Sequence, residues 1–278
     1  MAITVNTNVA SLTAQHALTG ATSKMNTAMQ RMSTGLKINS SKDDAAGLAV
    51  SSKLDYMVSS LSVAQSNAQM GASMLDTMEG VMGVINDNLV RIRDLTEQAA
   101  NGTYGTDAVA AIRTEINARL SEINRVANSA EFNGKKLLNG GTSSISLQVG
   151  IKNDDYSTIT LGSDVFQNST RTGLGFSDTD ITYTQSSQFK TFLGTVDEAL
   201  KRITNAQTAI GGRQAAITSA MESAQVMATN LTSASSLIKD ADIAEESSNY
   251  IKQQILQQTS ASLLATANQA PSIALNLV

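Results

Sequence analysis

The longest regular pattern in the chain spans residues 45–100, which read AAGLAVSSKLDYMVSSLSVAQSNAQMGASMLDTMEGVMGVINDNLVRIRDLTEQAA. Small and apolar residues recur in it at alternating spacings of three and four, and no proline interrupts the run. This heptad pattern predicts one helix whose apolar seam packs against partner helices with a slight left-handed supercoil. At a rise of ~1.5 Å per residue, the helix is roughly 80 Å long, too long for an ordinary compact domain. The seam consists of Leu54, Met57, Leu61, Ala64, Ala68, Gly71, Leu75, Met78, Met82, Ile85, Leu89 and Ile92.

Two further segments carry seams of the same kind. A second helix is expected over about 106–130, and the Asn101-Gly102 turn before it makes it antiparallel to the first. A third seam runs from residue 189 to residue 238 and is weakened at Gly211 and Gly212, because each helical glycine costs about 1 kcal/mol. The three together predict a mainly α protein, an elongated antiparallel helical bundle or coiled coil. Their seams are Val109, Ile112, Ile116, Leu120, Ile123 and Ala127 in the second helix, and Phe189, Leu193, Val196, Leu200, Ile203, Ile210, Ile217, Met221, Ala224, Ala228, Leu231 and Ile238 in the third.

The chain between these helices has a different composition. Residues 131–198 contain no alanine, whereas alanine, the best helix former, is frequent on both sides. Short β-type runs at residues 145–149 and 156–161 flank a polar turn at residues 152–155, which predicts a β-hairpin. We therefore expect a small β-containing insert, at about residues 131–188, within the helical bundle.

The two ends of the chain are amphipathic but poor in large apolar residues. Ordering one residue costs ~1–2 kcal/mol, and burying one large apolar side chain returns ~1.5–3 kcal/mol. A pair of helices from residues 4–34 and 243–270 should therefore be marginally stable alone. Packing against further copies would supply the missing burial, which indicates an assembly protein whose ends fold on association. The core of that assembly is expected to contain Val5, Val9, Leu12, Leu18, Met25, Met29, Met32, Ile251, Ile255, Leu263 and Leu264.

Composition and charge exclude several classes of function. The 278 residues include no cysteine and one histidine, which rules out disulfide frameworks, zinc clusters and sites that need two histidines. A net charge of -4 and an aromatic content of 4% argue against nucleic acid as a partner. No run approaches the ~18–20 apolar residues of a membrane span. The N-terminus lacks the basic start and the compact apolar run of a cleaved secretory signal.

No candidate site carries enzymatic chemistry. His16 is interpreted as a polar position on a terminal helix, because a lone ligand makes a poor metal site. The acidic group at residues 240–246 lacks the glycine of a calcium loop, so Asp240 or Asp242 is expected to cap a helix instead. Residues 42–47 lack the signature of a phosphate-binding loop and are interpreted as a connector. The sequence predicts no catalytic residue, no cofactor and no metal, and hence a protein that is not an enzyme.

Short motifs stand in a fixed order at the two ends of the chain. They are Ala2–Val9, Met29–Ser40, Lys42–Gly47, Arg91–Leu95 and Glu131–Lys135, followed by Ile210–Gln214, Ile238–Asp242 and Ala267–Ala270. In this order they resemble the bacterial flagellin family, and the match covers roughly residues 1–140 and 190–278. The resemblance implies a structural subunit that self-assembles into the helical flagellar filament used for swimming motility.

The resemblance also implies how the chain is divided and where it acts. Residues of about 1–43 and 240–278 would form a terminal coiled-coil core domain, and residues of about 44–239 a rod domain. In the family, export proceeds through the flagellar type III apparatus without a cleaved signal peptide, which implies an extracellular location in the flagellum. The implied partners are further copies of the chain, an export chaperone at the C-terminal segment, and the filament cap and hook-junction proteins.

A receptor patch of the family matches three positions of this chain. Arg91, Leu95 and Glu115 correspond to the patch that Toll-like receptor 5 recognises. Arg91 and Leu95 are four residues apart and are therefore expected on one helix face, with Glu115 on the antiparallel neighbour. Asp94 replaces the Glu common at its place in the family. The same residues could instead form contacts between subunits, and both interpretations can hold.

The central region is the main departure from the family pattern. About 50 residues separate the matching ends, so we expect no separate outer domain, and any modification sites on the insert. An alternative is a non-polymerising adaptor like the hook–filament junction proteins, but that interpretation expects drift in the motifs at residues 39–47 and 91–95, which are intact. A signalling coiled coil of the chemoreceptor kind would need membrane spans.

Overall fold

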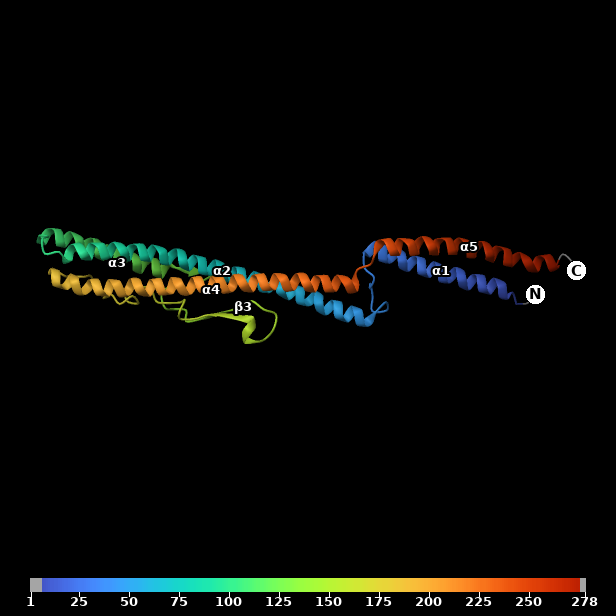
Figure 1. Cartoon of the computed structure of the whole chain (residues 1–278), viewed down its shortest axis with the longest axis horizontal. Coiled ribbons are helices and arrows are strands. Elements are labelled where there is room, and N and C mark those ends of the chain that lie inside the picture. Colours follow the sequence, from blue (N-terminus) through green and yellow to red (C-terminus); the bar gives the residue numbers. More distant parts are fainter. Residues whose placement is uncertain (1–6, 276–278) are drawn as a thin grey trace. The chain divides into compact units, whose positions relative to one another are not determined.

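The computed structural model describes residues 7–275 and confirms a mainly helical protein with small β-hairpins. By its internal contacts the chain divides into two compact units, Met1–Val58 with Thr229–Val278, and Ser59–Ala228. We call the first the terminal unit and the second the rod unit. The helices are α1 (Val9–Thr34), α2 (Ala45–Ala100), α3 (Thr106–Ser129), α4 (Ser186–Lys239) and α5 (Ile243–Leu275) (Figure 1). By their bounds, α2 and α4 each contribute residues to both units.

The rod unit is built on parts of α2, α3 and α4 that pack along the predicted seams. Hydrogen bonds across α2 and α4 join Arg93 to Asp197 at 2.8 Å and Gln65 to Gln225 at 3.0 Å, so the two helices are antiparallel. One continuous apolar core lies between the three helices. Its fully buried members include Leu75, Met78, Met82, Ile85, Leu89, Ile92, Ile116, Leu120, Ile123, Val196, Ile203, Ile210 and Ile217.

Two short antiparallel hairpins follow α3. The first pairs β1 (Glu131–Phe132) with β2 (Lys135–Lys136) through a two-residue turn, in which Asn133 and Gly134 have φ of 47° and 78°. Positive φ at both positions is the geometry that Asn-Gly favours in tight hairpins. The second pairs β3 (Ile145–Gln148) with β4 (Thr158–Leu161), which confirms the predicted hairpin, and a 3-10 turn, η1 (Asp155–Ser157), precedes β4.

The remainder of the insert packs onto the rod unit. Phe166, Leu174 and Phe176 are buried in the same apolar core as the helices. Asn117 of α3 both donates to the carbonyl of Ile181, at 3.1 Å, and accepts from its N–H, at 2.8 Å. Among residues 7–275, the insert at about residues 131–188 belongs to the rod unit and forms no separate compact unit.

In the terminal unit, α1 and α5 lie side by side and antiparallel (Figure 1). Asn8 donates to the carbonyl of Ala267 at 2.7 Å, and Gln257 to Thr22 at 3.0 Å. α1 ends at Gly35, whose φ of 72° is the left-handed geometry of a helix C-cap. Of the two aspartates expected to cap α5, Asp242 does so, and it accepts from the N–H groups of the first turn at 2.8 and 3.2 Å.

Candidate assembly interface

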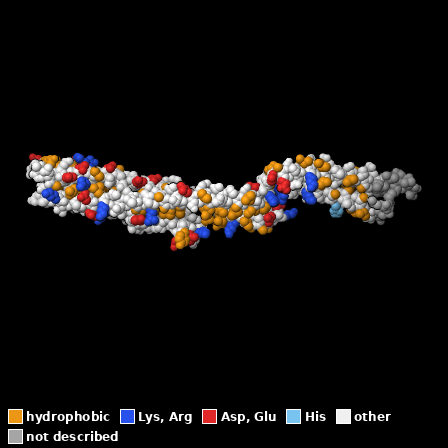
Figure 2. Space-filling model, in the orientation of Figure 1, with side chains coloured by type: hydrophobic (Ala, Val, Ile, Leu, Met, Phe, Trp, Pro, Cys, Tyr) orange, Lys and Arg blue, Asp and Glu red, His pale blue; other side chains and the backbone are white. Residues whose placement is uncertain are grey.

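The terminal helix pair buries small side chains and exposes large ones. Ala21, Ala28 and Ser260 are buried in this unit. Six of the large apolar residues expected in the assembly core are 48–66% exposed, and they are Val9, Leu12, Met29, Ile251, Ile255 and Leu263. Leu18, Met25, Met32 and Leu264 are half-buried, and Val5 lies outside the described residues. Figure 2 shows hydrophobic side chains at the surface of this helix pair. A single copy therefore leaves apolar surface in water that another helix can cover.

An ion pair also joins α1 to α5. Nη1 of Arg31 lies 2.9 Å from Oε1 of Glu246, and the two side chains are only 28% and 11% exposed. A partly buried pair of this kind is costly to break on one side, because the remaining charge loses its partner. The sequence placed Glu246 in an acidic first turn of a helix, and the more distant partner Arg31 was not anticipated.

The connection between the helices of the terminal unit is held by aspartates. The N–H of Lys37 donates to the carbonyl of Lys239 at 2.7 Å. Asp55 accepts from the hydroxyl of Ser235 at 2.7 Å and from Nζ of Lys239 at 3.2 Å. These two hydrogen bonds hold the pKa of Asp55 below its usual value, and the bond from Ser235 has the larger effect. Asp43 accepts from the hydroxyl and N–H of Ser40, and its pKa is likewise lowered.

Residues 42–47 are a connector stabilised by caps. Asp44 accepts from the N–H of Gly47 at 2.9 Å and so caps the first turn of α2. His16 is exposed on α1. Over the described part of the chain, no group of three or more metal-ligating side chains comes together. The geometry of residues 44–47 is that of a helix start.

On the rod unit, two of the three receptor-patch positions form a surface ion pair. Nε and Nη2 of Arg91 lie 3.0 and 3.3 Å from the two carboxylate oxygens of Glu115, which joins α2 to α3. This hydrogen bonding raises the pKa of Arg91. Leu95 is only 2% exposed, so the expectation that it shares the exposed face of Arg91 is wrong. It packs in the apolar core next to the buried seam position Thr96, because the buried face of α2 is wider than the seam alone.

The structure buries most of the seam residues that the sequence singled out. Leu54, Leu200 and Leu231 are half-buried. The buried ones are Leu61, Leu75, Met82, Ile85, Leu89, Ile92, Ile203 and Ile217. Within the described residues, no helix is long and apolar enough to cross a membrane.

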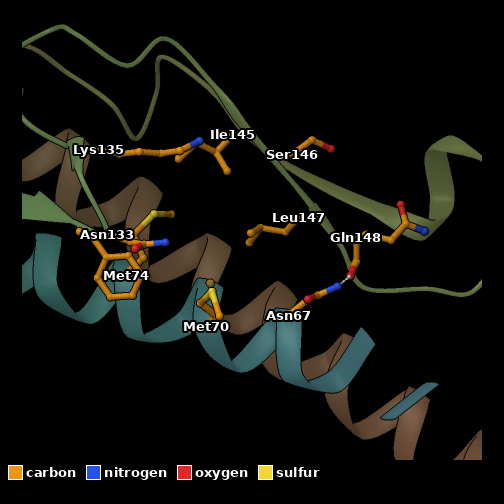
Figure 3. A pocket seen from close by; sticks show the side chains of 11 residues that line it. Asn67, Met70, Met74, Asn133, Lys135, Ile145, Ser146, Leu147 and Gln148 are labelled. Carbon is orange, nitrogen blue, oxygen red and sulfur yellow. Dashed lines mark hydrogen bonds between the residues drawn. The ribbon is translucent and has the colours of Figure 1, made fainter. Parts of the chain in front are cut away.

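A shallow apolar groove of about 340 Å³ lies between α2 and β3 (Figure 3). Met70 and Met74 of α2 form one wall, and Ile145 and Leu147 of β3 the other. Leu147 packs directly on Gly71, where a β-carbon would overlap its side chain. The sequence marked Gly71 only as a seam position, and no local signal connects it with a residue in the insert.

Comparison with known proteins places this arrangement in one family. Models for the bacterial flagellin N-terminal and C-terminal helical regions match residues 5–143 and 193–278. Flagellin D of Vibrio cholerae is 31% identical over 376 positions that cover all of both chains, so it carries segments that this chain lacks. The flagellar filament 33 kDa core protein of Treponema phagedenis is 32% identical over 288 positions, which cover 99% of each chain.

A solved structure shares the fold. The protein is described as flagellar hook-associated and comes from Vibrio parahaemolyticus, and it is 17% identical with a TM-score of 0.56, over 70% of this chain and 98% of its own. The two family models together match well over half of the chain, in agreement with relatives matched along its whole length. The chain therefore belongs to the bacterial flagellin family, whose members are structural subunits of the flagellar filament and not enzymes.

Proposed function

We propose that this chain polymerises through its terminal helix pair into an extracellular flagellar filament for swimming motility. The observation that carries the proposal is the exposed apolar surface of α1 and α5, where six large side chains remain 48–66% exposed. Burying a large apolar side chain contributes ~1.5–3 kcal/mol, so covering the exposed part of six contributes on the order of 6 kcal/mol. A further copy of the same helix pair supplies a surface of the same character.

The proposed division of the chain into a filament core and a rod is that of the family. Residues of about 1–43 and 240–278 form the filament core, and residues of about 44–239 form the rod around it. The break between α1 and α2, and that between α4 and α5, lie at these boundaries. By contacts alone, residues 44–58 and 229–239 group with the terminal helices.

The test is electron microscopy of purified monomer after addition of sulfate, which strengthens burial of apolar surface. Full-length chains should form filaments, whereas chains lacking residues 1–40 and 242–278 should stay monomeric. If full-length chains remain monomeric even on preformed filament seeds, polymerisation is refuted. The alternative, a non-polymerising adaptor at the hook–filament junction, then takes its place.

We also propose that Toll-like receptor 5 recognises the rod surface at Arg91 and Glu115, with Leu95 as a core residue beneath it. Support comes from the exposed, bidentate pair of Arg91 and Glu115 between two helices. In a receptor-binding assay, Arg91→Ala should weaken binding with unchanged thermal stability. Leu95→Ala should lower thermal stability, because Leu95 lies in the core. If the Arg91→Ala variant binds the receptor as tightly as the wild type, the patch is refuted.

Further partners complete the proposal. An export chaperone holds the C-terminal segment, and cap and hook-junction proteins contact the growing filament. Export leaves the N-terminus uncut, which intact-mass measurement of exported protein tests directly. A mass lower by a leader segment would refute export without cleavage.

A further inference from the structure

A second heptad seam runs along α2, on the side that faces away from the rod core. Its residues alternate in spacing between four and three, as the buried seam does, and all of them are exposed. The larger side chains Val63, Met70 and Val84 are 45–59% exposed. We call this set the outer seam, and it consists of Ser59, Val63, Ser66, Met70, Ser73, Thr77, Gly80 and Val84.

The outer seam carries no charged residue. The solvent face of a helix in a soluble protein is normally rich in charges. Beyond Val84 the same spacing continues into Asp87, Arg91 and Asp94, so the charge-free stretch has a definite end. Depletion of charge at the centre, with charges at the edge, is the composition of a surface that another protein covers.

Three of the hydroxyl groups of the outer seam are already satisfied within α2. Ser66 donates to the carbonyl of Ser62 at 3.1 Å, Ser73 to that of Gln69 at 3.1 Å, and Thr77 to that of Ser73 at 2.9 Å. Covering the outer seam therefore leaves none of these three donors without a partner. Met70 also lines the groove against β3, so the apolar surface extends from the seam toward Leu147 (Figure 3).

We infer that α4 of a second copy covers the outer seam in the assembled filament, which rests on the filament function proposed above. The fitting face of α4 is Thr204, Thr208, Gly211, Ala215 and Thr218, all exposed, uncharged and small. Its three threonines also donate to carbonyls of their own helix, at 2.8–3.0 Å. The three larger side chains of the outer seam, Val63, Met70 and Val84, can pack as knobs between the small side chains of this face of α4.

The contact pairs two different faces of the rod unit, so it does not close on itself. A heterologous contact of this kind repeats from copy to copy and suits an open helical polymer. Because α2 and α4 are antiparallel within one chain, a neighbour of the same polarity presents α4 antiparallel to α2.

The outer seam is too small to hold two copies together by itself, so it is expected to act only within a polymer. From residue 59 to residue 84 a helix is roughly 39 Å long and ~10 Å wide, which is about 400 Å² on each copy. Stable complexes bury about 1,200 Å² or more in total, so this contact alone does not hold a dimer in solution. It becomes effective once the terminal helices bring the copies together.

Disulfide cross-linking tests this pairing, because the chain has no cysteine of its own. Full-length chains with Met70→Cys are mixed with chains that carry one cysteine on α4, in a panel of Thr208→Cys, Gly211→Cys, Ala215→Cys and Thr218→Cys. The mixture is polymerised, oxidised and resolved on a non-reducing gel. Thr114→Cys on the exposed face of α3 replaces Met70→Cys as the matched control.

We expect mixed dimers between Met70→Cys and at least one α4 variant, and none with the control. Filaments without any such dimer overturn the inference, as do dimers only between two Met70→Cys chains, which indicate α2 against α2. If wild-type chains form no filaments, the filament function fails and this inference with it.

Elongation on wild-type seeds provides a second measurement that needs no cross-link. Met70→Glu should slow elongation about tenfold or more, since it buries a charge, whereas the same substitution at the control position, Thr114→Glu, should elongate as the wild type does. Circular dichroism of both monomers controls for folding. Equal elongation by the two variants overturns the inference.

Discussion

Gly71 is a position where the β3–β4 hairpin packs closely on α2, and Gly71→Ala makes that contact measurable. A β-carbon at this position would overlap a terminal methyl of Leu147. Alanine in a helix interior is more favourable than glycine by about 1 kcal/mol. Overpacking a well-filled contact costs typically ~1–3 kcal/mol. Because the methyl that must move is the end of a half-buried side chain beside a groove, we expect the second effect to lie at the low end of its range and roughly to cancel the first, so that the free energy of unfolding changes by less than about 1 kcal/mol.

Gly83→Ala is the matched control in the same helix, because a β-carbon there meets no atom within 4 Å. It should raise the free energy of unfolding by about 1 kcal/mol, which is roughly 2–4 °C in melting temperature for a unit of this size. Urea unfolding of full-length monomer, followed by far-ultraviolet circular dichroism, measures both variants. In a Leu147→Ala background, Gly71→Ala should become stabilising, since its obstacle is gone. If Gly71→Ala stabilises the wild-type chain as much as Gly83→Ala does, the close packing of the hairpin on α2 is refuted.

Three further outcomes are expected. Leu120→Ala opens a cavity in the rod core and should lower the free energy of unfolding by ~2–5 kcal/mol in urea; a loss below 1 kcal/mol contradicts a tightly packed site. Glu246→Gln leaves Arg31 partly buried without its ion-pair partner and should cost on the order of 2 kcal/mol, measured as a lower thermal midpoint of the terminal unit, with a clearly smaller loss from the exposed control Glu245→Gln, which shares the first turn of α5. The pKa of Asp55 is lower in the folded chain than its unfolded value of 3.8, so its ionised form stabilises the fold above pH 3.8, and this stability is lost as the pH falls through the folded pKa. The melting temperature should therefore drop as the pH falls over this range, and it should drop less steeply in Asp55→Asn.

Local patterning determined most of the helical architecture. The unbroken spacing from Leu54 to Ile92 predicted one helix, and α2 has the predicted bounds, Ala45–Ala100. A buried seam is legible in sequence because the helix repeat places every third and fourth residue on one side. The β3–β4 hairpin was also predicted from the sequence, because two short β-type runs flank a polar turn.

Face assignment at the ends of a seam was beyond the sequence. Leu95 was placed beside Arg91 on the surface, because residues four apart share a helix face. The seam continues past Ile92 through Thr96, and the buried face also includes Leu95, while Arg91 reaches Glu115. The positions of α3 and α4 decide which of two neighbouring faces of α2 is covered. The spacing of residues along α2 does not give those positions.

The sequence by itself predicted the helices, the β3–β4 hairpin and a helix cap at Asp240 or Asp242, because each depends on neighbours within a few residues. Tertiary structure alone decided which distant side chains meet: Arg31 with Glu246, and Gly71 with Leu147. It also decided which apolar residues stay in water, on α1, on α5 and along the outer seam. The spacing of apolar residues in a helix predicts that one face will be covered. Which helix covers that face depends on how elements far apart in the chain, or separate copies of it, pack together.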